Sequence, residues 1–172
     1  MTALSTHLIT DHDPQGNSII TDVVAESSHK HEMPFGTIEY LYSNSAILSD
    51  ITHAGDLEHT KHCRINGLPN GRVTCDNGVA VALTSLKPGE SSPMHRTRSL
   101  DLGIILEGEV ELELDNGLKR VLKAGDTIVQ RGTVHRWRNI SKADGWLRMY
   151  FVTIDTKPIL IEGKELPEEW RV

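Results

Sequence analysis

The stretch that decides the fold runs from Gly89 to Asn139 and holds two polar clusters separated by an alternating segment. The first cluster reads Gly89-Glu-Ser-Ser-Pro-Met-His-Arg-Thr-Arg-Ser-Leu-Asp101, and the second reads Gly125-Asp-Thr-Ile-Val-Gln-Arg-Gly-Thr-Val-His-Arg-Trp-Arg-Asn139. Between them, three apolar residues alternate with three glutamates from 109 to 114, directly before Asp-Asn-Gly at 115–117. This alternation, followed by residues that tolerate positive φ, predicts a β-hairpin.

The spacing of polar residues within the two clusters predicts a shared cavity. Side chains on a strand alternate between its two faces, so residues two apart share a face. One face of the first strand therefore carries His95, Thr97, Ser99 and Asp101, and one face of the second carries His135, Trp137 and Asn139. If both faces point inward, two imidazoles and a carboxylate meet in one cavity.

Further strands are predicted on both sides of this stretch. Alternating or apolar runs bounded by turn residues occupy residues 78–87, 117–123, 127–130 and 146–155. Many short strands joined by Gly-rich turns, without a long helical period, are typical of an antiparallel sandwich or barrel. We therefore expect an all-β chain whose main barrel spans residues 80–154, in a single domain covering residues 1–172.

The flanking segments carry weaker patterns. Residues 7–22 place two short apolar pieces around a turn-forming Asp-His-Asp-Pro-Gln-Gly-Asn run, which predicts a hairpin-like N-terminal arm within the lead-in 1–79. Residues 23–70 are expected to be irregular with one or two short strands, and 155–172 to be a tail with at most one helical turn. The histidines of the lead-in are expected in solvated loops: His29, His31, His53, His59 and His62.

The composition is that of an ordinary globular protein and does not favour nucleic acid as a partner. The 172 residues are 38% hydrophobic and 24% charged, with a formal net charge of −6 and a pI near 5.8. This charge argues against nucleic-acid binding, which depends on clustered basic residues. Five arginines nevertheless surround the clusters and either attract an anionic ligand or form a solvated rim: Arg96, Arg98, Arg131, Arg136 and Arg138.

The chain also shows no targeting signal in its sequence. It has neither a basic start followed by an apolar run nor about 18 consecutive apolar residues, so no signal peptide, membrane span or membrane partner is predicted. We expect a cytoplasmic protein in which Cys63 and Cys75 stay reduced.

The two clusters resemble the cupin superfamily, whose motifs are G-x5-H-x-H-x3/4-E-x6-G and G-x5-P-x-G-x2-H-x3-N. The matching positions are Gly89, His95, Gly108, Gly125, Gly132, His135 and Asn139. Thr97 and Asp101 stand where the family has its second histidine and its glutamate, and Arg131 falls near the family's proline. The resemblance, to small single-domain cupins, implies a jelly-roll β-barrel. It also implies a homodimer, because small cupins commonly exchange N-terminal strands.

Two kinds of chemistry are open to this site. A set of two histidines and one carboxylate (His95, Asp101 and His135) suits a divalent metal such as Fe, Mn, Zn or Ni with free coordination positions. Without a metal, the same three residues form an acid/base group, with Asp101 orienting a histidine that moves a proton. Four neighbours are predicted to bind a small-molecule substrate: Thr97, Arg131, Trp137 and Met94.

Three functions therefore compete. The first is a lyase or isomerase that performs dehydration, decarboxylation or proton transfer on an oxygenated organic acid or polyketide-like metabolite. The second is a metal-dependent dioxygenase, and the third is a non-catalytic protein that binds a small ligand. The fold alone does not choose between them, because one fold hosts many reactions.

Overall fold

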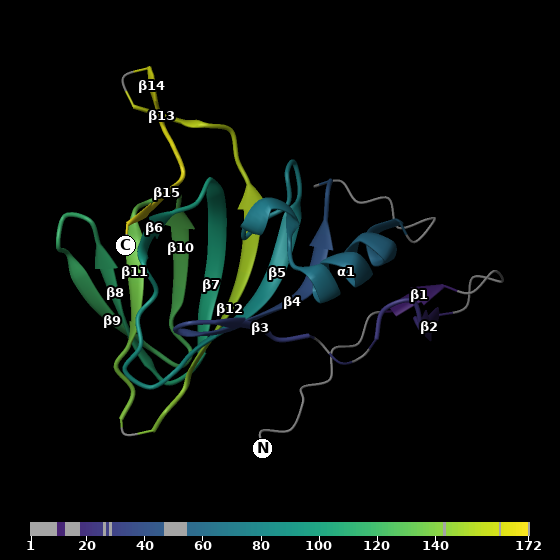
Figure 1. Ribbon diagram of the computed structural model, residues 1–172, viewed down its shortest axis with the longest axis horizontal. Helices are drawn as coiled ribbons and strands as arrows, with labels where there is room; N and C mark the ends of the chain where they lie inside the picture. The colour runs from purple at the N-terminus through teal and green to yellow at the C-terminus, as the bar shows by residue number, and fades with distance from the viewer. Residues whose placement is uncertain are drawn as a thin grey trace.

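The computed structural model describes residues 10–12, 18–25, 27, 29–46, 55–142, 144–161 and 163–171. Two antiparallel sheets face each other and form the predicted jelly-roll barrel, with one helix outside it (Figure 1). The six-stranded sheet has the order β10-β7-β12-β5-β4-β3, and the five-stranded sheet has the order β15-β6-β11-β8-β9. The all-β prediction is confirmed.

The strands of the six-stranded sheet come from distant parts of the chain, between residues 31 and 155. In sheet order they are β10 (Thr127–Arg131), β7 (Ser99–Glu107), β12 (Leu147–Asp155), β5 (Val79–Leu86), β4 (Gly36–Asn44) and β3 (His31–Met33). Apart from β3 and β4, these strands were predicted from alternation. The expectation of irregular structure with one or two short strands here is partly right, since β3 is short, but β4 has nine residues. Most of β4 is buried because α1 packs on it, which removes the need for a one-sided pattern.

The five-stranded sheet carries both motif histidines. Its strands in sheet order are β15 (Glu169–Arg171), β6 (Met94–Arg96), β11 (His135–Asn139), β8 (Glu109–Leu114) and β9 (Lys119–Lys123). The predicted hairpin is confirmed as β8 and β9, which are joined by residues 115–118. The main core lies between the two sheets and is built by Leu86, Ile105, Val110, Leu112, Trp137, Leu147 and Met149.

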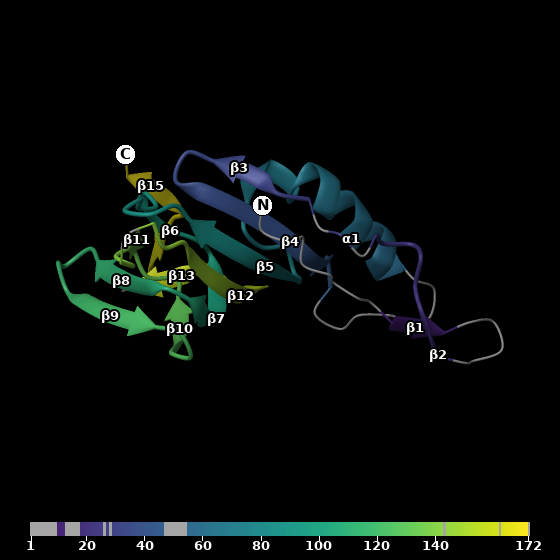
Figure 2. The same ribbon diagram turned by 90° about the horizontal axis from the view of Figure 1, so that it is seen from below.

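Helix α1 (Gly55–Asn66) stands where solvated loops were expected, and it packs on β4 (Figure 2). Its buried side chains are Asp56, Leu57, Thr60, Cys63 and Arg64, only two of which are apolar. Docking through polar groups leaves little apolar periodicity for a sequence pattern to detect. The sequence features that do indicate a helix are acidic residues in its first turn, Arg64 in its last turn, and Gly67 directly after it. Gly67 adopts φ 77°, as is common for a glycine that ends a helix.

The C-terminal segment is also different from its prediction. Instead of a loose tail, it forms a hairpin of β13 (Ile159–Ile161) and β14 (Lys164–Leu166), followed by β15 on the edge of the barrel. The short 3-10 helix Pro69–Gly71 completes the elements after α1. Residues outside 80–154 thus supply β3, β4 and β15 to the two sheets.

The N-terminal arm is confirmed as a hairpin within the described residues. Strand β1 (Thr10–His12) pairs with β2 (Ser18–Ile20), and both lie apart from the two sheets in Figures 1 and 2. Ile19 and Ile20 are exposed. His53 lies outside the described residues. Among the described residues, no helix has the length and apolar character needed to cross a membrane.

Candidate functional site

A cavity of about 120 Å³ opens between the two sheets and collects most of the predicted site residues. Its lining includes His95, Thr97, Asp101, His135 and Trp137. The opposite wall is apolar and includes Phe35, Met149 and Phe151. The structure therefore brings two imidazoles and one carboxylate to the same cavity, as predicted. The single strand expected through residues 95–101 is wrong, however: the chain leaves β6 at residues 97–98 and re-enters as β7 in the other sheet, so His95 and Asp101 reach the cavity from opposite sheets.

The two histidines meet because their strands are neighbours. His95 on β6 and His135 on β11 are direct cross-strand partners, so their side chains point to the same face. Their ring centroids are 4.3 Å apart, with an interplanar angle of 49°. Trp137, two residues after His135 on the same face, contacts that imidazole edge to face at 5.6 Å.

Main-chain carbonyls fix the orientation of both imidazoles. Nδ1 of His95 donates to the carbonyl of Pro93 at 2.8 Å, and Nδ1 of His135 donates to the carbonyl of Thr133 at 2.9 Å. Because a carbonyl only accepts, the proton of each neutral ring sits on Nδ1, which leaves the Nε2 lone pair of each ring as an acceptor. The expected orienting carboxylate, Asp101, does not hold this place; two carbonyls do.

Burial keeps the two rings neutral. Desolvation lowers the pKa of His135 to about 3, with a further lowering from the nearby His95. The pKa of His95 is also lowered, again mainly by burial, although the hydrogen bond to Pro93 opposes the shift. Burial disfavours the charged imidazolium, and two adjacent imidazoles disfavour it further. At neutral pH the pair therefore presents acceptors rather than positive charge.

Asp101 is perturbed in the opposite direction. Its side chain is 7% exposed, and burial raises its pKa to about 6, partly offset by a hydrogen bond from Ser99. Its Oδ1 atom is buried without a hydrogen-bond partner among the described residues. A carboxyl with this pKa exchanges its proton near neutrality, which is the property a general acid or base requires.

The remaining predicted substrate residues divide into two groups. Thr97 and Trp137 line the cavity, but the Thr97 hydroxyl already shares a 2.9 Å hydrogen bond with that of Ser99. Met94 and the exposed Arg131 are not among the lining residues that the structure describes. Nearby arginines turn to acidic partners instead: Arg136 to Glu113, Arg96 to Glu169, and Arg98 to Asp155.

The sequence did not predict the residues of the apolar wall, nor the one aromatic residue that touches a motif histidine from the C-terminal segment. Trp170 on β15 lines the cavity and stacks on His95, with centroids 4.6 Å apart and an interplanar angle of 6°. It lies 75 residues beyond His95 in a segment expected to be a tail, so no local spacing links the two. The signal that existed was a large aromatic residue in an otherwise polar terminal segment.

The motif asparagine has a structural role. Asn139 is 1% exposed, and its Nδ2 donates to the carbonyls of Leu86, Lys87 and Gly145. It therefore ties β11 to the end of β5. Gly108, another motif residue, has φ 86°, and an added Cβ would lie 2.9 Å from the carbonyl oxygen of Trp146. These two residues shape the barrel rather than its chemistry.

The histidines expected in loops are partly built into the structure. His31 lies on β3 and contacts the carbonyl of Arg64 through Nε2 at 3.1 Å. His59 lies on α1, with Nε2 3.4 Å from Cys75 Sγ and 3.5 Å from Cys63 Sγ. Both cysteines are buried and form no disulfide in the structure. His29 is exposed in a loop, as expected, whereas His62 is exposed but lies on α1 rather than in a loop.

The donor set fits a metal only in part. Both histidines line the cavity with Nδ1–H held by a carbonyl, which leaves Nε2 available as a donor atom and is the usual arrangement of metal-binding imidazoles. Across the described part of the chain, however, no three His, Cys, Asp or Glu side chains lie close enough together to hold an ion. The third family position is Thr97, whose hydroxyl is already engaged. The described residues thus supply two strong donors of an incomplete set.

Comparisons with known proteins agree with this architecture. A family model described as "Cupin domain" matches residues 82–152. Phomopsin biosynthesis cluster protein C' of Diaporthe leptostromiformis is 38% identical over 159 residues, covering 92% of this chain and 82% of that protein. The cupin-domain-containing oxidoreductase srdB of Neurospora crassa is 35% identical over 160 residues, covering 92% and 77%.

A solved structure shows the same fold. The RmlC-like cupin from Shewanella frigidimarina superposes with a TM-score of 0.50 at 13% identity, covering 77% of this chain and 87% of that one. Together with the strand order, the motif positions and the paired histidines, these similarities show that the chain belongs to the cupin superfamily.

Proposed function

We propose that this cupin is an enzyme of secondary metabolism that transfers a proton on a small oxygenated metabolite, as a lyase or isomerase. The observation that carries the proposal is a buried carboxyl facing a cavity shared with two neutral imidazoles. The metabolic setting rests on the name of a relative from a phomopsin biosynthesis cluster.

The protonation states of Asp101, His95 and His135 give them different roles in this reaction. Asp101 accepts or delivers the proton, because its pKa of about 6 makes both forms available near neutrality. The Nε2 atoms of His95 and His135 accept hydrogen bonds from substrate hydroxyl groups and so fix the substrate beside the carboxyl. His135 is too weak a base in this environment to take the proton itself.

The lining also suggests the class of substrate. Among the described residues that form the cavity wall, none is Arg or Lys, whereas many are aromatic or aliphatic. A carboxylate substrate would enter this site without a counter-ion, at a high desolvation cost. We therefore favour a neutral, mostly apolar, polyketide-like metabolite with hydroxyl or carbonyl groups over an organic acid.

Deuterium incorporation tests the proposal. Purified protein is incubated in D₂O with a panel of neutral hydroxylated ketones and aldehydes, and exchange or rearrangement is followed by mass spectrometry. Incorporation that persists with EDTA and is lost in Asp101→Asn supports proton transfer by the carboxyl. Retained turnover in Asp101→Asn contradicts it, and binding with unchanged ligand after long incubation indicates a ligand-binding protein.

A metal-dependent oxidation is the second candidate. It is favoured by the carbonyl-held Nδ1 atoms, which leave two imidazole donors free, and by the name oxidoreductase given to the Neurospora relative. If an ion binds, His95 and His135 would hold it and it would supply Lewis acidity or redox chemistry. Activity that EDTA abolishes and a divalent metal restores would establish this candidate.

Restoring the family's missing ligand separates the two candidates further. Thr97→His adds a third imidazole at a position that lines the same cavity as His95 and should raise Ni²⁺ or Zn²⁺ affinity about 10-fold or more in calorimetric titration. In an acid/base enzyme the bound ion occupies the substrate position and inhibits. Thr97→Val is the matched control, since it removes the hydroxyl without adding a donor.

We also propose that the protein forms a homodimer. The arm exposes Ile19 and Ile20, and the outer face of the six-stranded sheet exposes the cross-strand pair Leu102 and Val129, which are 41% and 63% exposed. A two-stranded hairpin is marginal alone in water, so an apolar partner surface would stabilise it. The partner is a second copy of this chain, in keeping with the cupin resemblance.

A further inference from the structure

We propose that Trp170 is the gate residue of the cavity: strand β15 closes the site by stacking this indole on His95, and it lifts to admit a ligand. The inference rests on the proposed ligand site and adds to it a residue that controls access. It is carried by the position of Trp170, by the interactions that hold β15, and by the route of the chain that leads to it.

Trp170 occupies the mouth of the cavity rather than its interior. It pairs with His95 across the β15–β6 edge, and the two rings stack almost in parallel. The side chain lines the cavity and yet is 52% exposed. One part of the indole therefore faces the cavity while another faces solvent, so the indole stands between water and the imidazole.

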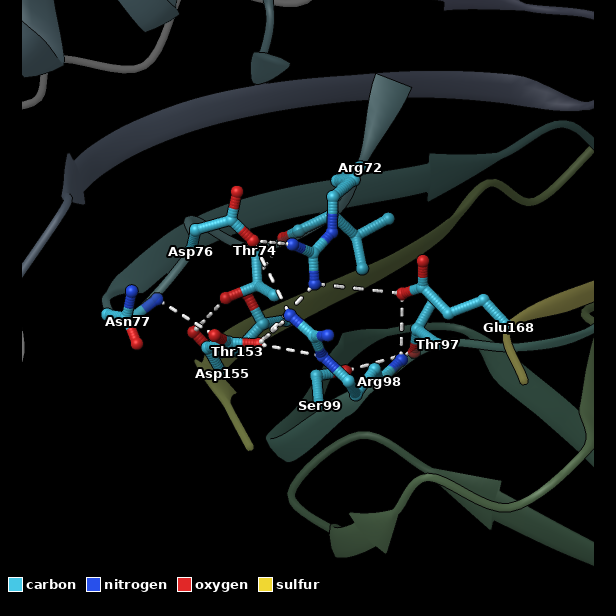
Figure 3. A network of polar contacts seen from close by, with 11 residues as sticks. Arg72, Thr74, Asp76, Asn77, Thr97, Arg98, Ser99, Thr153, Asp155 and Glu168 are labelled. Carbon is cyan, nitrogen blue, oxygen red and sulfur yellow. Dashed lines mark hydrogen bonds and ion pairs between the residues drawn. The ribbon is translucent and has the colours of Figure 1, made fainter. Parts of the chain in front are cut away.

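The strand that carries Trp170 is held mainly by polar contacts. Glu168 accepts from the main-chain N–H of Arg98 at 2.9 Å and lies 3.8 Å from Nη2 of Arg72 (Figure 3). Arg96 donates to the carbonyl of Pro167 at 3.2 Å and pairs with Glu169 at 3.6 Å. Partly exposed ion pairs of this kind each contribute little to stability.

The arginines that hold the strand are themselves fixed to the barrel. Arg72 and Arg98 both contact Oδ1 of Asp155, at 3.4 and 3.3 Å, and Asp155 ends β12 (Figure 3). Asp155 also accepts from the main-chain N–H of Asn77 at 2.8 Å. The barrel side of these contacts is therefore firmly placed. Strand β15 has three residues, pairs only with β6 among the described strands, and adds a half-exposed ion pair from Arg171 to Asp115 at 3.7 Å.

The route of the chain allows β15 to move by itself. Between β12 and β15 lies the β13–β14 hairpin, which projects from the barrel in Figure 1 and exposes Leu160 and Ile161. No barrel strand follows β15 among the described residues. Separation of β15 from β6 thus costs few buried contacts, as expected for a segment at the low-stability end of a fold.

Chemical modification of His95 tests the gate without a substrate. Diethyl pyrocarbonate reacts with neutral imidazole nitrogen, and peptide mass spectrometry gives the rate at each histidine of the full-length protein. Trp170→Ala should raise the rate at His95 about 2- to 10-fold, the range given by loss of an aromatic stacking contact. Glu168→Ala should raise it less, and Trp170→Phe should stay near the wild-type rate because it keeps a stacked ring.

Two controls make the result specific. Trp146→Ala removes a similarly exposed indole that does not line the cavity, and partly buried His59, whose Nε2 contacts two thiols away from the cavity, reports general loosening within the same sample. An unchanged His95 rate in Trp170→Ala overturns the gate, as does an equal rise in Trp146→Ala or at His59. The rates involve no turnover, so the gate can hold even if Asp101→Asn shows that the proposed reaction is wrong.

Discussion

Two regions of this molecule bury a histidine beside other reactive groups, and they use it differently. At the cavity, His95 and His135 each donate from Nδ1 to a main-chain carbonyl, which leaves Nε2 available to a ligand. Under α1, Nε2 of His59 is already in contact with the thiols of Cys63 and Cys75. Burial lowers the pKa of His59 as it does those of the cavity pair.

The difference shows that a perturbed pKa does not by itself identify a functional histidine. The two regions differ in the state of Nε2. In the cavity pair Nε2 is an available acceptor beside an open space, whereas Nε2 of His59 contacts Cys63 and Cys75, which belong to a second hydrophobic cluster. In that cluster burial raises the pKa of Cys75 to about 11, so the thiol stays protonated and behaves as a packing group.

The largest expected effect compares the two regions directly. His135→Ala and Asp101→Asn should each reduce turnover at least about 100-fold, the usual size of a lost acid/base or positioning group. His59→Ala and His31→Ala should keep turnover, because their Nε2 atoms contact thiols or a carbonyl away from the cavity. Steady-state kinetics on an identified substrate measures this, and turnover near the wild-type rate in His135→Ala would contradict the site.

The helix region should instead respond in stability. Arg64 is 4% exposed, and its guanidinium donates to the carbonyls of Ala25 and Leu41. Arg64→Ala leaves those acceptors without donors and should lower the free energy of unfolding by about 2–4 kcal/mol, measured by urea denaturation. Lys61→Ala, an exposed change on the same helix, should stay within about 0.5 kcal/mol. If Arg64→Ala reduced turnover more than stability, the helix region would not be separate from the catalytic cavity.

The third effect is the pH dependence of stability, to which His135 and Asp101 contribute with opposite signs. His135, whose folded pKa is about 3 against an ordinary 6.5, stabilises the fold above pH 6.5, and this contribution is lost as the pH falls toward 3. Asp101, with a folded pKa of about 6 against 3.8, stabilises the fold below pH 3.8, and this contribution is lost as the pH rises through 6.

Variants separate these two contributions. His135→Gln should flatten the loss of stability on acidification by about 1–3 kcal/mol between pH 6.5 and 4, and Asp101→Asn should make that loss steeper. Urea denaturation at several pH values gives both curves. Identical curves for the wild type and His135→Gln would show that the imidazole is not held neutral by burial.

The smallest effect concerns the arm, which unlike α1 is not docked on either sheet. Deleting residues 1–22 should shift the species from dimer toward monomer in sedimentation velocity, with a loss of stability of about 1 kcal/mol. Replacing both Ile19 and Ile20 by Ser should reproduce the shift if the apolar side chains carry the contact. A full-length chain that is already monomeric at micromolar concentration would rule out the proposed dimer.

The prediction of the fold succeeded where one face of a strand is buried. Alternation located the β8–β9 hairpin, β5 and β12, and spacing placed His135 and Trp137 on one inward face. His95 and Asp101 also line the cavity, but from two strands in different sheets rather than from the one strand expected. Alternation failed for β4, which is buried too fully to alternate, and for α1, which docks through polar groups such as Thr60 and Arg64. Both failures have one cause, since their burial depends on partners far away in the sequence.

The sequence by itself determined that His135 and Trp137 share one face of a strand, because the two-residue period of a strand is local. It also determined that Thr97 replaces an imidazole in the motif. Only the tertiary structure decided that carbonyls rather than Asp101 orient the histidines, that the nearby arginines pair with acidic residues outside the cavity, and that Trp170 covers His95. These contacts join segments brought together by the closing of two sheets, which no local period encodes.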